Sequence, residues 1–326
     1  MSGNFPQNTP PAQEAWKAEP PLLNAFRGTS KPRGHEWIVP GILFVATVIS
    51  TTFAGLFYES GDVDFLSAIQ IVIFKPYLLL RGVPFSLTLI TVLLAHEMGH
   101  FLVCRYYGIR CTPPFFIPIP ISIAGTLGAF IRIKSPFPNR KVLFDVGIAG
   151  PLAGFIFVVP ALIIGISFSR LIPKGGLQGG VYFGEPLIFR WIGQWVLGYS
   201  PSSQDMIANP IAMAAWIGLL ATSLNLLPIW QLDGGHIAYA VLGSKLQRKL
   251  SIAAAIALML VSFAGWPFPS YLLFGLLLLV LGMRSRFYHP PTMSENEEIG
   301  RARWVLSVAA LVILIICFTP APISIS

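Results

Sequence analysis

The sequence predicts an all-α polytopic membrane protein with about seven transmembrane helices (six to eight) and one short membrane-associated β-hairpin. Hydrophobic residues make up 54% of the 326 residues and charged residues only 11%, whereas soluble domains carry about 25% charged residues. Apolar stretches of about 20 residues, long enough to cross a bilayer, recur along the chain. The net charge of +8 does not indicate nucleic-acid binding, because the basic residues lie in short segments between the apolar stretches. The lipid bilayer is the expected environment, and no nucleic-acid partner is expected.

The apolar stretches give the expected order of spans. They are residues 37–57, 83–104, 142–168 and 209–229, two helices within 249–283 that separate at "GWPFPS", and 304–320. A further apolar stretch at 65–80 contains Lys75 and Pro76, so we expect it to be interfacial or re-entrant rather than an eighth span. Residues 1–36 are polar and rich in proline, which predicts a flexible cytoplasmic segment before the first span.

The distribution of basic residues predicts the orientation in the membrane. If the N-terminus is cytoplasmic, the segments on the cytoplasmic side hold 17 of the 22 Lys and Arg residues. Cytoplasmic loops of membrane proteins are enriched in these residues. We therefore predict a cytoplasmic N-terminus, and seven spans then place the C-terminus on the opposite side.

One segment between spans has the period of a strand rather than that of a helix. Within residues 114–135, isoleucines alternate with other residues on both sides of the Gly-rich "AGTLG", which predicts a β-hairpin that turns there. Pro118 and Pro120 place the first arm at an edge, because proline cannot donate to a central ladder. An apolar edge strand beside the membrane could pair with another extended chain.

Two histidines and a glutamate lie inside the apolar stretch "TVLLAHEMGHFLV". Ionisable groups within a span are rare and expensive, so they indicate function. On a helix, His96 and His100 are four residues apart and share a face, so both could bind one metal ion. Glu97 would lie next to a metal-bound water as general base, as in the HExxH motif of zinc hydrolases. The alternative is a pair of buried histidines that form hydrogen bonds across helices.

A catalytic zinc site usually has three protein ligands, so a third is expected. Asp233 in "NLLPIWQLDGGH" is the candidate, because Pro228 interrupts that span and "DGG" permits a sharp turn. In the predicted topology the spans that carry "HEMGH" and "LDGG" run in the same direction, so the two motifs lie at a similar depth. The alternative for Asp233 is a helix N-cap. His35 and His289 lie in polar segments beside the membrane, and His236 is expected to be an interfacial neighbour of the site rather than a ligand.

The span at 142–168 contains a further acidic residue and a series of glycines. Asp145 lies near its start, where the helix dipole favours a carboxylate, so we expect a structural role. Gly147, Gly150 and Gly154 recur at spacings of three and four residues. Small residues at these spacings let helices approach closely, and packing is their expected role.

Four motifs together resemble the site-2 protease family, whose members are M50-type zinc metalloproteases that cut within the membrane. The motifs are "HEMGH" (96–100), "GTLGAFIRIKSP" (125–136), "FDVGIAGPLAG" (144–154) and "NLLPIWQLDGG" (225–235). The resemblance implies that His96, His100 and Asp233 bind one Zn²⁺ ion and that Glu97 is the catalytic base. It also implies that the β-hairpin and the segment before "LDGG" handle the substrate. The residues expected to bind substrate are Gly125, Thr126, Leu127, Gly128, Asn225 and Pro228.

The resemblance covers residues 83–243, which we interpret as the catalytic core. A first span with the interfacial segment (37–82) would precede it, and C-terminal spans (244–326) would follow. No PDZ domain fits between the core spans, so the chain resembles the PDZ-less type found in bacteria and plastids. We expect a multi-pass protein of the bacterial cytoplasmic membrane, with an organelle membrane as the alternative.

The predicted function is the cleavage of transmembrane segments of single-pass membrane proteins, known as regulated intramembrane proteolysis. A site-1-type protease that trims the substrate beforehand is a candidate partner. One alternative is a membrane zinc protease of another type that cuts soluble or misfolded chains, although no glutamate besides Glu97 lies within a span to serve as its third ligand. The other alternative is a non-proteolytic transporter or scaffold with a zinc site, which the intact set of His, Glu, His and Asp disfavours.

Overall fold

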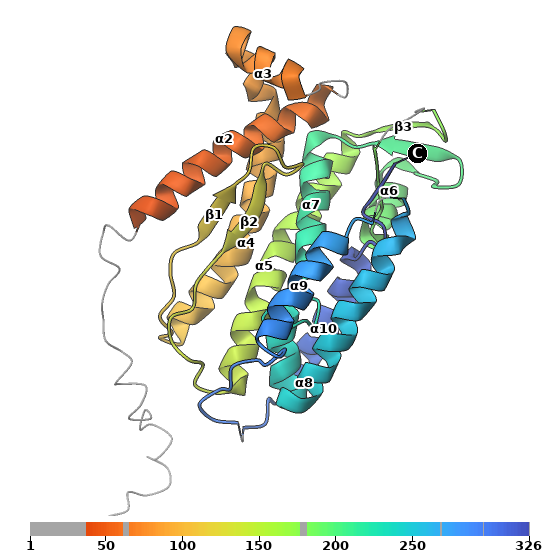
Figure 1. Cartoon of the computed structure of the whole chain (residues 1–326). Helices are drawn as coiled ribbons and strands as arrows, with labels where there is room; N and C mark the ends of the chain where they lie inside the picture. Colours follow the sequence, from red (N-terminus) through yellow and green to blue (C-terminus); the bar gives the residue numbers. More distant parts are fainter. Residues whose placement is uncertain (1–36, 61–64, 177–180, 268, 296, 326) are drawn as a thin grey trace, which may run out of the picture.

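The described part of the chain is mostly helical, as predicted (Figure 1). The structure, a computed structural model, describes residues 37–60, 65–176, 181–267, 269–295 and 297–325. The segment predicted to be flexible, residues 1–36, lies outside the described residues.

The helices are joined by short loops and by three small antiparallel strand pairs. In chain order the helices are α2 (Ile38–Ser60), α3 (Phe65–Phe74), the 3₁₀ helix η2 (Pro76–Gly82), α4 (Val83–Tyr106), α5 (Arg140–Ser167), α6 (Leu187–Leu197), α7 (Pro210–Asn225), α8 (Asp233–Val261), the 3₁₀ helix η3 (Ser262–Gly265), α9 (Leu272–Arg284) and α10 (Arg301–Cys317). The strands are β1 (Phe115–Pro118), β2 (Thr126–Phe130), β3 (Arg170–Pro173), β4 (Val181–Phe183), β5 (Gln204–Ile207) and β6 (Ile323–Ile325). They pair as β1–β2, β3–β5 and β4–β6.

Four helical stretches among the described residues are long and apolar enough to cross a membrane. They are Ile38–Tyr58, Pro76–Tyr106, Arg140–Ser167 and Asp233–Gly265. The last is interrupted by a kink at Gly243, which has φ 77° and ψ 171°. Helices α6, α7 and α9 are apolar but shorter. Length and composition therefore support four spans, while the total of seven and the cytoplasmic N-terminus stay predictions.

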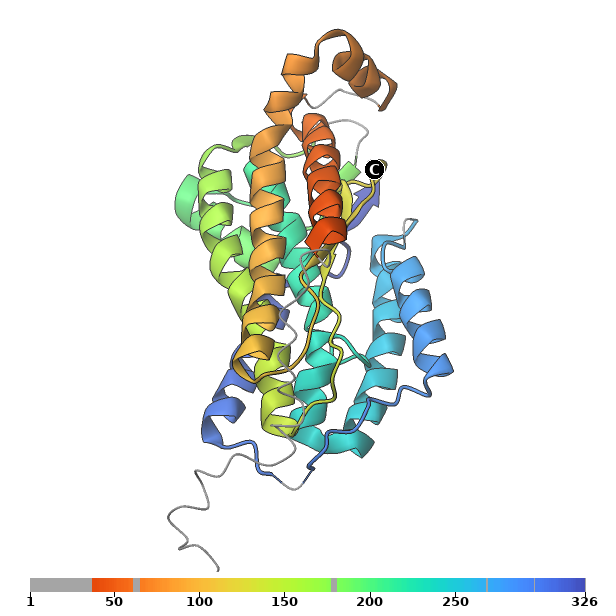
Figure 2. The same cartoon turned by 90° about the vertical axis from the view of Figure 1, so that its left-hand side faces the viewer.

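Helices α4, α5 and α7 pack side by side at the centre and contribute most of the main core (Figures 1 and 2). Their backbones touch at small residues. A Cβ atom on Gly99 would lie only 2.4 Å from the Ala149 oxygen, and a Cβ on Gly165 only 2.2 Å from the Ala212 nitrogen. In lipid, helices associate through such close packing rather than through the hydrophobic effect. The centre of the molecule therefore depends on small residues at the helix contacts.

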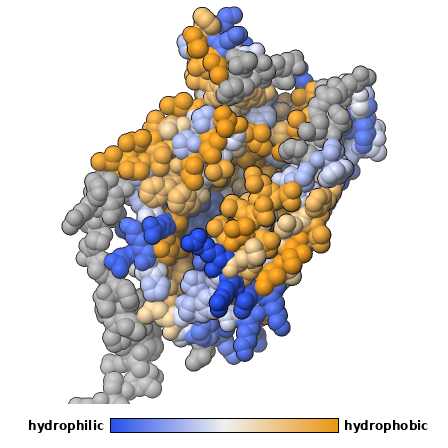
Figure 3. Space-filling view, viewed as in Figure 1, coloured by the Kyte–Doolittle hydropathy of each residue, from blue (hydrophilic) through white to orange (hydrophobic). Residues whose placement is uncertain are grey.

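Large apolar side chains cover the outward faces of α2, α9 and α10. Exposed examples are Ile42, Val45, Ile49, Leu273, Leu276, Leu277, Val305 and Val308. Figure 3 shows hydrophobic residues over α2 and α9, and hydrophilic residues gathered at the lower end of the molecule. Exposed apolar area of this extent suits a surface that faces lipid.

The predicted β-hairpin is present, but it turns earlier than predicted. Pro118 of β1 lies opposite Thr126 of β2, so the turn occupies residues 119–125. Most of "AGTLG" therefore belongs to the second strand. The reason is local: the Thr126 hydroxyl donates to the Ile117 carbonyl at 2.8 Å and fixes this residue in the ladder. Gly125, with φ 72°, ends the turn.

The tip of the hairpin rests on α2. The Ser50 hydroxyl donates to the Gly125 carbonyl at 2.6 Å, and the Tyr58 hydroxyl donates to the Ile123 carbonyl at 2.8 Å. A Cβ on Gly125 would lie 2.5 Å from the Ser50 carbonyl oxygen. Glycine is therefore required here both for the positive φ and for the close approach to α2.

The apolar stretch at 65–80 forms α3 and most of η2, with Lys75 between them. Figure 1 shows α3 above α2, at the top of the molecule. The last residue of η2, Gly82, contacts the α2 backbone, because a Cβ there would lie 1.9 Å from the Thr52 oxygen. The placement of this segment as interfacial or re-entrant stays a prediction.

The chain between α5 and α7 folds at the same end of the molecule as the C-terminus (Figure 1). Strand β3 pairs with β5, and β4 pairs with the C-terminal strand β6. Helix α6 lies between β4 and β5 in sequence. Its Trp191 and Trp195 side chains are exposed. Tryptophans are typical of the membrane–water boundary.

Asp145 has a structural role, as expected, but it lies in the second turn of α5 rather than at the helix start, because α5 begins at Arg140 with Asn139 as its N-cap. Asp145 instead accepts hydrogen bonds from Nε and Nη2 of Arg303 in α10, at 2.8 and 2.5 Å. It also accepts one from the Tyr107 hydroxyl at 2.6 Å. The carboxylate therefore ties α10 and the end of α4 to α5.

Replacing Arg303 with alanine should lower the thermal stability of the protein in detergent. The change removes a two-pronged, mostly buried ion pair, and charged hydrogen bonds of this kind contribute about 1.5–3 kcal/mol. Arg301→Ala, at an exposed position in the same helix, is the matched control. Equal melting temperatures for the two variants would contradict this role of the pair.

Candidate metal centre

Helix α4 places His96 and His100 on one face, as their spacing predicts. Both residues are only 6% exposed, and their Nε2 atoms are 3.3 Å apart. The Nδ1–H of His100 donates to the Val146 carbonyl of α5 at 2.7 Å. This hydrogen bond leaves the lone pair on His100 Nε2 available to a metal ion.

A break between α7 and α8 brings Asp233 to the histidines. Helix α7 ends at Asn225, and the chain turns through residues 226–232, where Trp230 has φ 45°. Leu232, not Asp233, is the N-cap of α8. The N-cap alternative for Asp233 is therefore wrong, and its carboxylate points at the two imidazoles.

Three donor atoms converge at this point. Asp233 Oδ2 lies 3.1 Å from His96 Nε2 and 3.3 Å from His100 Nε2. Two donors bound to one tetrahedral zinc ion at ~2.1 Å would be roughly 3.4 Å apart. Lone pairs crowded this closely repel one another unless a cation lies among them. The donor set and its spacing therefore fit a single zinc ion.

The two glycines after Asp233 act through close approach rather than through a turn. A Cβ on Gly234 would lie 2.0 Å from the Leu226 carbonyl oxygen, and a Cβ on Gly235 would lie 2.2 Å from the Trp230 oxygen. Both residues are already helical. The sharp turn predicted at "DGG" is thus located just before this motif, in residues 226–232. The glycines let the start of α8 pack onto that turn.

The glycine series of α5 makes room for the side chains of the site. A Cβ on Gly150 would lie 2.0 Å from His100 Nε2, and a Cβ on Gly154 would lie 3.3 Å from His96 Nδ1. The sequence predicted helix packing for these residues. The structure adds that the packing partners are the two imidazole rings themselves.

Glu97 is buried next to the three donors but is not one of them. The backbone of Ile131, in the return arm of the hairpin, lies beside its carboxylate. The hairpin therefore reaches the site at Ile131. A buried carboxylate beside a metal centre, held but not coordinated, is placed to exchange protons.

Of the residues expected to bind substrate, Asn225 lies at the metal centre. Its Nδ2 atom is 3.3 Å from His96 Nε2. Pro228 lies in the turn between α7 and α8, where its carbonyl accepts a hydrogen bond from Ser251 at 2.9 Å. This bond fixes the turn to the second part of α8.

The four hairpin residues expected to bind substrate have different surroundings. Gly125 lies against α2, and Thr126 is buried with its hydroxyl in the ladder. Leu127 is 70% exposed, and Gly128 has φ 106° with open space where a Cβ would lie. Leu127 and Gly128 are thus the accessible part of this set.

The remaining histidines were only partly anticipated. His236 is a neighbour of the site, as expected, but its Nδ1 atom lies 2.6 Å from Nε2 of His289. His289 lies in the segment between α9 and α10 but is only 3% exposed, and nothing in the sequence indicated this burial. His35 lies outside the described residues. No spacing pattern links 236 to 289, so only the fold could reveal this pair.

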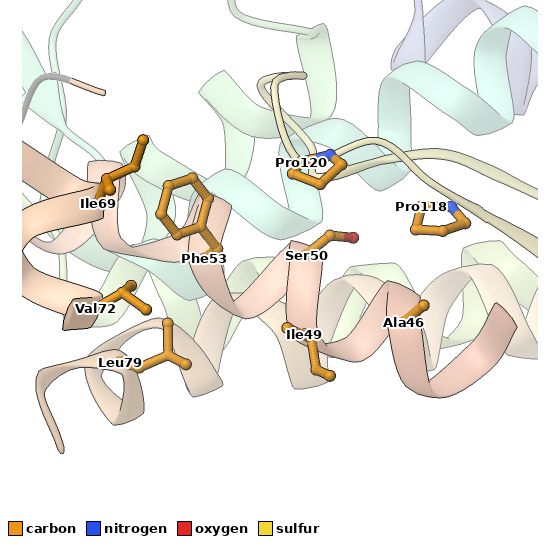
Figure 4. Close-up of a pocket in the computed structure, with 9 residues that line it drawn as sticks. All are labelled: Ala46, Ile49, Ser50, Phe53, Ile69, Val72, Leu79, Pro118 and Pro120. Carbon is orange, nitrogen blue, oxygen red and sulfur yellow. The ribbon is translucent and has the colours of Figure 1, made fainter. Parts of the chain in front are cut away.

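An apolar cavity of about 540 Å³ lies beside the first hairpin arm (Figure 4). It is lined by Ala46, Ile49, Ser50, Phe53, Ile69, Val72, Leu79, Pro118 and Pro120. None of the three metal donors lines it. The cavity is therefore distinct from the metal centre, and its lining residues come from α2, α3, η2 and the hairpin.

Fold and site together define a helical membrane protein with a buried His-Glu-His and Asp centre suited to zinc. The model of peptidase family M50 matches residues 84–266, which is more than half of the chain. The chain belongs to this family of peptidases.

Relatives of the chain are named probable zinc metalloproteases. The probable zinc metalloprotease EGY2, chloroplastic, of Arabidopsis thaliana is 36% identical over 183 residues, covering 56% of this chain and 32% of the relative. The probable zinc metalloprotease EGY1, chloroplastic, of the same plant is 28% identical, covering 73% of this chain and 43% of the relative. EGY3 of Oryza sativa, also named a probable zinc metalloprotease, is 26% identical, covering 93% and 51%. The chain spans about half or less of the length of these relatives.

Gly150→Ala should lower the affinity for zinc by roughly tenfold or more, because the added methyl group displaces the His100 ring. Gly154→Ala should have a smaller effect, since its methyl group would only touch His96. Gly41→Ala, in α2 with open space around it, is the control. Chelator competition on purified protein measures the affinities. Wild-type affinity in Gly150→Ala would contradict this packing role.

Proposed function

We propose that this protein is an intramembrane zinc metalloendopeptidase that cleaves transmembrane segments of single-pass membrane proteins. The observation that carries the proposal is the convergence of His96, His100 and Asp233 among apolar helices, with Glu97 buried beside them. Membership of peptidase family M50 and the names of the relatives support the zinc-dependent protease part of the proposal.

The residues divide into a metal-binding set and a proton-transfer group. His96, His100 and Asp233 would hold the zinc ion. When bound, zinc lowers the pKa of water and polarises a carbonyl group. Glu97 accepts the proton of the attacking water as the new C–O bond forms, and gives a proton to the amine as the C–N bond breaks. Asn225, beside His96, donates a hydrogen bond to the oxygen of the reacting carbonyl.

The hairpin supports the handling of a helical substrate. A transmembrane helix hides its peptide bonds, so it must unwind before cleavage, and each unpaired backbone group in lipid is costly. An extended substrate segment could pair with an edge of the β1–β2 ribbon and replace the lost hydrogen bonds. The return arm contacts Glu97 at Ile131, so a segment paired there would lie next to the base.

Substrates, partners and location complete the proposal. The buried site suits single-pass proteins, already shortened by an upstream site-1-type protease, since a bulky domain would obstruct access. The relatives are named chloroplastic. We place this chain in a bacterial cytoplasmic membrane, with an organelle membrane as the alternative, and protease assays on membranes from the source cells would distinguish them.

Glu97→Gln should abolish cleavage of a transmembrane peptide and retain zinc. Glutamine keeps the size of the side chain but cannot accept the proton, and loss of a general base costs about 10²–10⁴ in rate. Cleavage by the purified protein in detergent, with metal analysis of the same sample, measures both properties.

Asp233→Ala is the matched control, because it should lose zinc as well as activity. A Glu97→Gln variant with substantial cleavage would remove Glu97 as the base. An Asp233→Ala variant with full zinc would remove Asp233 as a ligand.

Gly125→Ala should reduce cleavage of a transmembrane peptide several-fold while zinc stays bound. The methyl group would push the hairpin tip off α2 at Ser50, and the hairpin would no longer be held in place for the substrate. Gly198→Ala is the control, because Gly198 also has a positive φ of 66° but has open space around it. If both variants cleave equally well, the seating of the hairpin on α2 does not matter for substrate binding.

A further inference from the structure

The chain between α9 and α10 contacts the elements that surround the metal centre. We call residues 288–295 the strap. The strap lies outside the part matched by the family, residues 84–266. Its Met293 and Ser294 amides donate to the carbonyls of Phe137 and Pro138, each at 3.0 Å. Figure 1 shows the strap passing at the lower end of the molecule, beside the return arm of the hairpin.

The strap is held in shape by Glu295. One oxygen of this carboxylate accepts hydrogen bonds from the Thr292 amide and hydroxyl, at 3.0 and 2.9 Å. The same oxygen accepts the hydroxyl of Tyr239 in α8 at 2.7 Å. These bonds fix the strap to α8 nearly two turns beyond the candidate metal ligand.

His289 is the part of the strap that reaches furthest into the protein. It is 3% exposed, and its ring stacks on Tyr239 with centroids 4.4 Å apart. Its Nδ1–H donates to the Pro290 carbonyl at 2.7 Å. A neutral His289 therefore has its lone pair on Nε2, where it accepts the Nδ1–H of His236 at 2.6 Å.

His236 lies in the first turn of α8, immediately after Asp233 and the two glycines. On its other side is α5, since a Cβ on Gly147 would lie 2.9 Å from His236 Cβ and 3.4 Å from the Asp233 carbonyl oxygen. The first turn of α8 is thus held between α5 and the strap. A shift of this turn would move the Asp233 carboxylate relative to the two imidazoles.

We propose that His289 is a positioning residue for Asp233, which it holds through its hydrogen bond with His236. The proposal rests on the proposed function, in which Asp233 is a zinc ligand. Partners of metal ligands outside the ligand set commonly change metal affinity by about 10–100-fold. Here the partner acts on the helical turn that carries the ligand, and it comes from a segment beyond the family core.

The test is the affinity for zinc, measured by chelator competition on the purified full chain. His289→Phe keeps the ring on Tyr239 but removes the acceptor, and should weaken zinc binding roughly tenfold. His289→Gln restores an acceptor and should bind zinc within about threefold of wild type. His289→Ala should also weaken zinc binding roughly tenfold. It replaces His289→Phe in the test if the phenylalanine variant does not fold.

Tyr239→Phe is the matched control, because it loosens the strap at Glu295 but leaves the two histidines in contact. It should lower the melting temperature without the tenfold loss of zinc affinity. Unchanged zinc affinity in His289→Phe would overturn the proposal, and so would equal loss in all four variants. Wild-type protein that binds zinc but cleaves no peptide would overturn the proposed function. In that case the zinc affinities of the variants would still decide whether His289 positions Asp233.

Discussion

The structure depends on satisfying a few polar side chains inside an apolar bundle. His96, His100 and Asp233 lie among helices whose outer surfaces are suited to lipid, where an unpaired charge or lone pair is costly. The backbone fixes His100 through its hydrogen bond to Val146, and the three donor atoms face one another at one point. A zinc ion would complete this set, because it converts crowded lone pairs into ligands. The packing of α4, α5, α7 and the start of α8 can be understood as the means of keeping these groups together.

Glycines in α5 make room for the imidazole rings of His96 and His100 inside the helix bundle. Helix α5 has no side chain at Gly150 and Gly154, so the imidazoles of α4 lie directly against its backbone. The same reasoning applies at Gly234 and Gly235, where the start of α8 lies on the turn that precedes it. In water a cavity at such a position could be filled by solvent, but in lipid the helices must meet. The glycines thus determine where the ligands are placed as well as how the helices pack.

The hairpin and the strap approach the same centre from different parts of the chain. The hairpin rests on α2 at its tip and reaches Glu97 at Ile131. The strap pairs with the chain just after the hairpin and holds His236 through His289. The hairpin, which lies within the core but rests on α2 outside it, therefore supports the base, and the strap beyond the core supports the turn that carries the carboxylate ligand. This arrangement suggests that the parts outside the matched family region shape the site rather than merely anchoring the chain.

The sequence by itself determined the membrane character, the helical class, the hairpin and the pairing of His96 with His100, because these follow from composition and from periods of two and four residues. Asp233 could be proposed from the break at Pro228, but its distance to the histidines depended on the fold. Local hydrogen bonding by Thr126 decided where the hairpin turns, and the ion pair with Arg303 decided the surroundings of Asp145. The burial of His289 and its contact with His236 had no sequence signal, since the two residues lie far apart in the chain. Periodicity reports which face of an element is apolar, whereas contacts between distant segments are decided only when the helices pack.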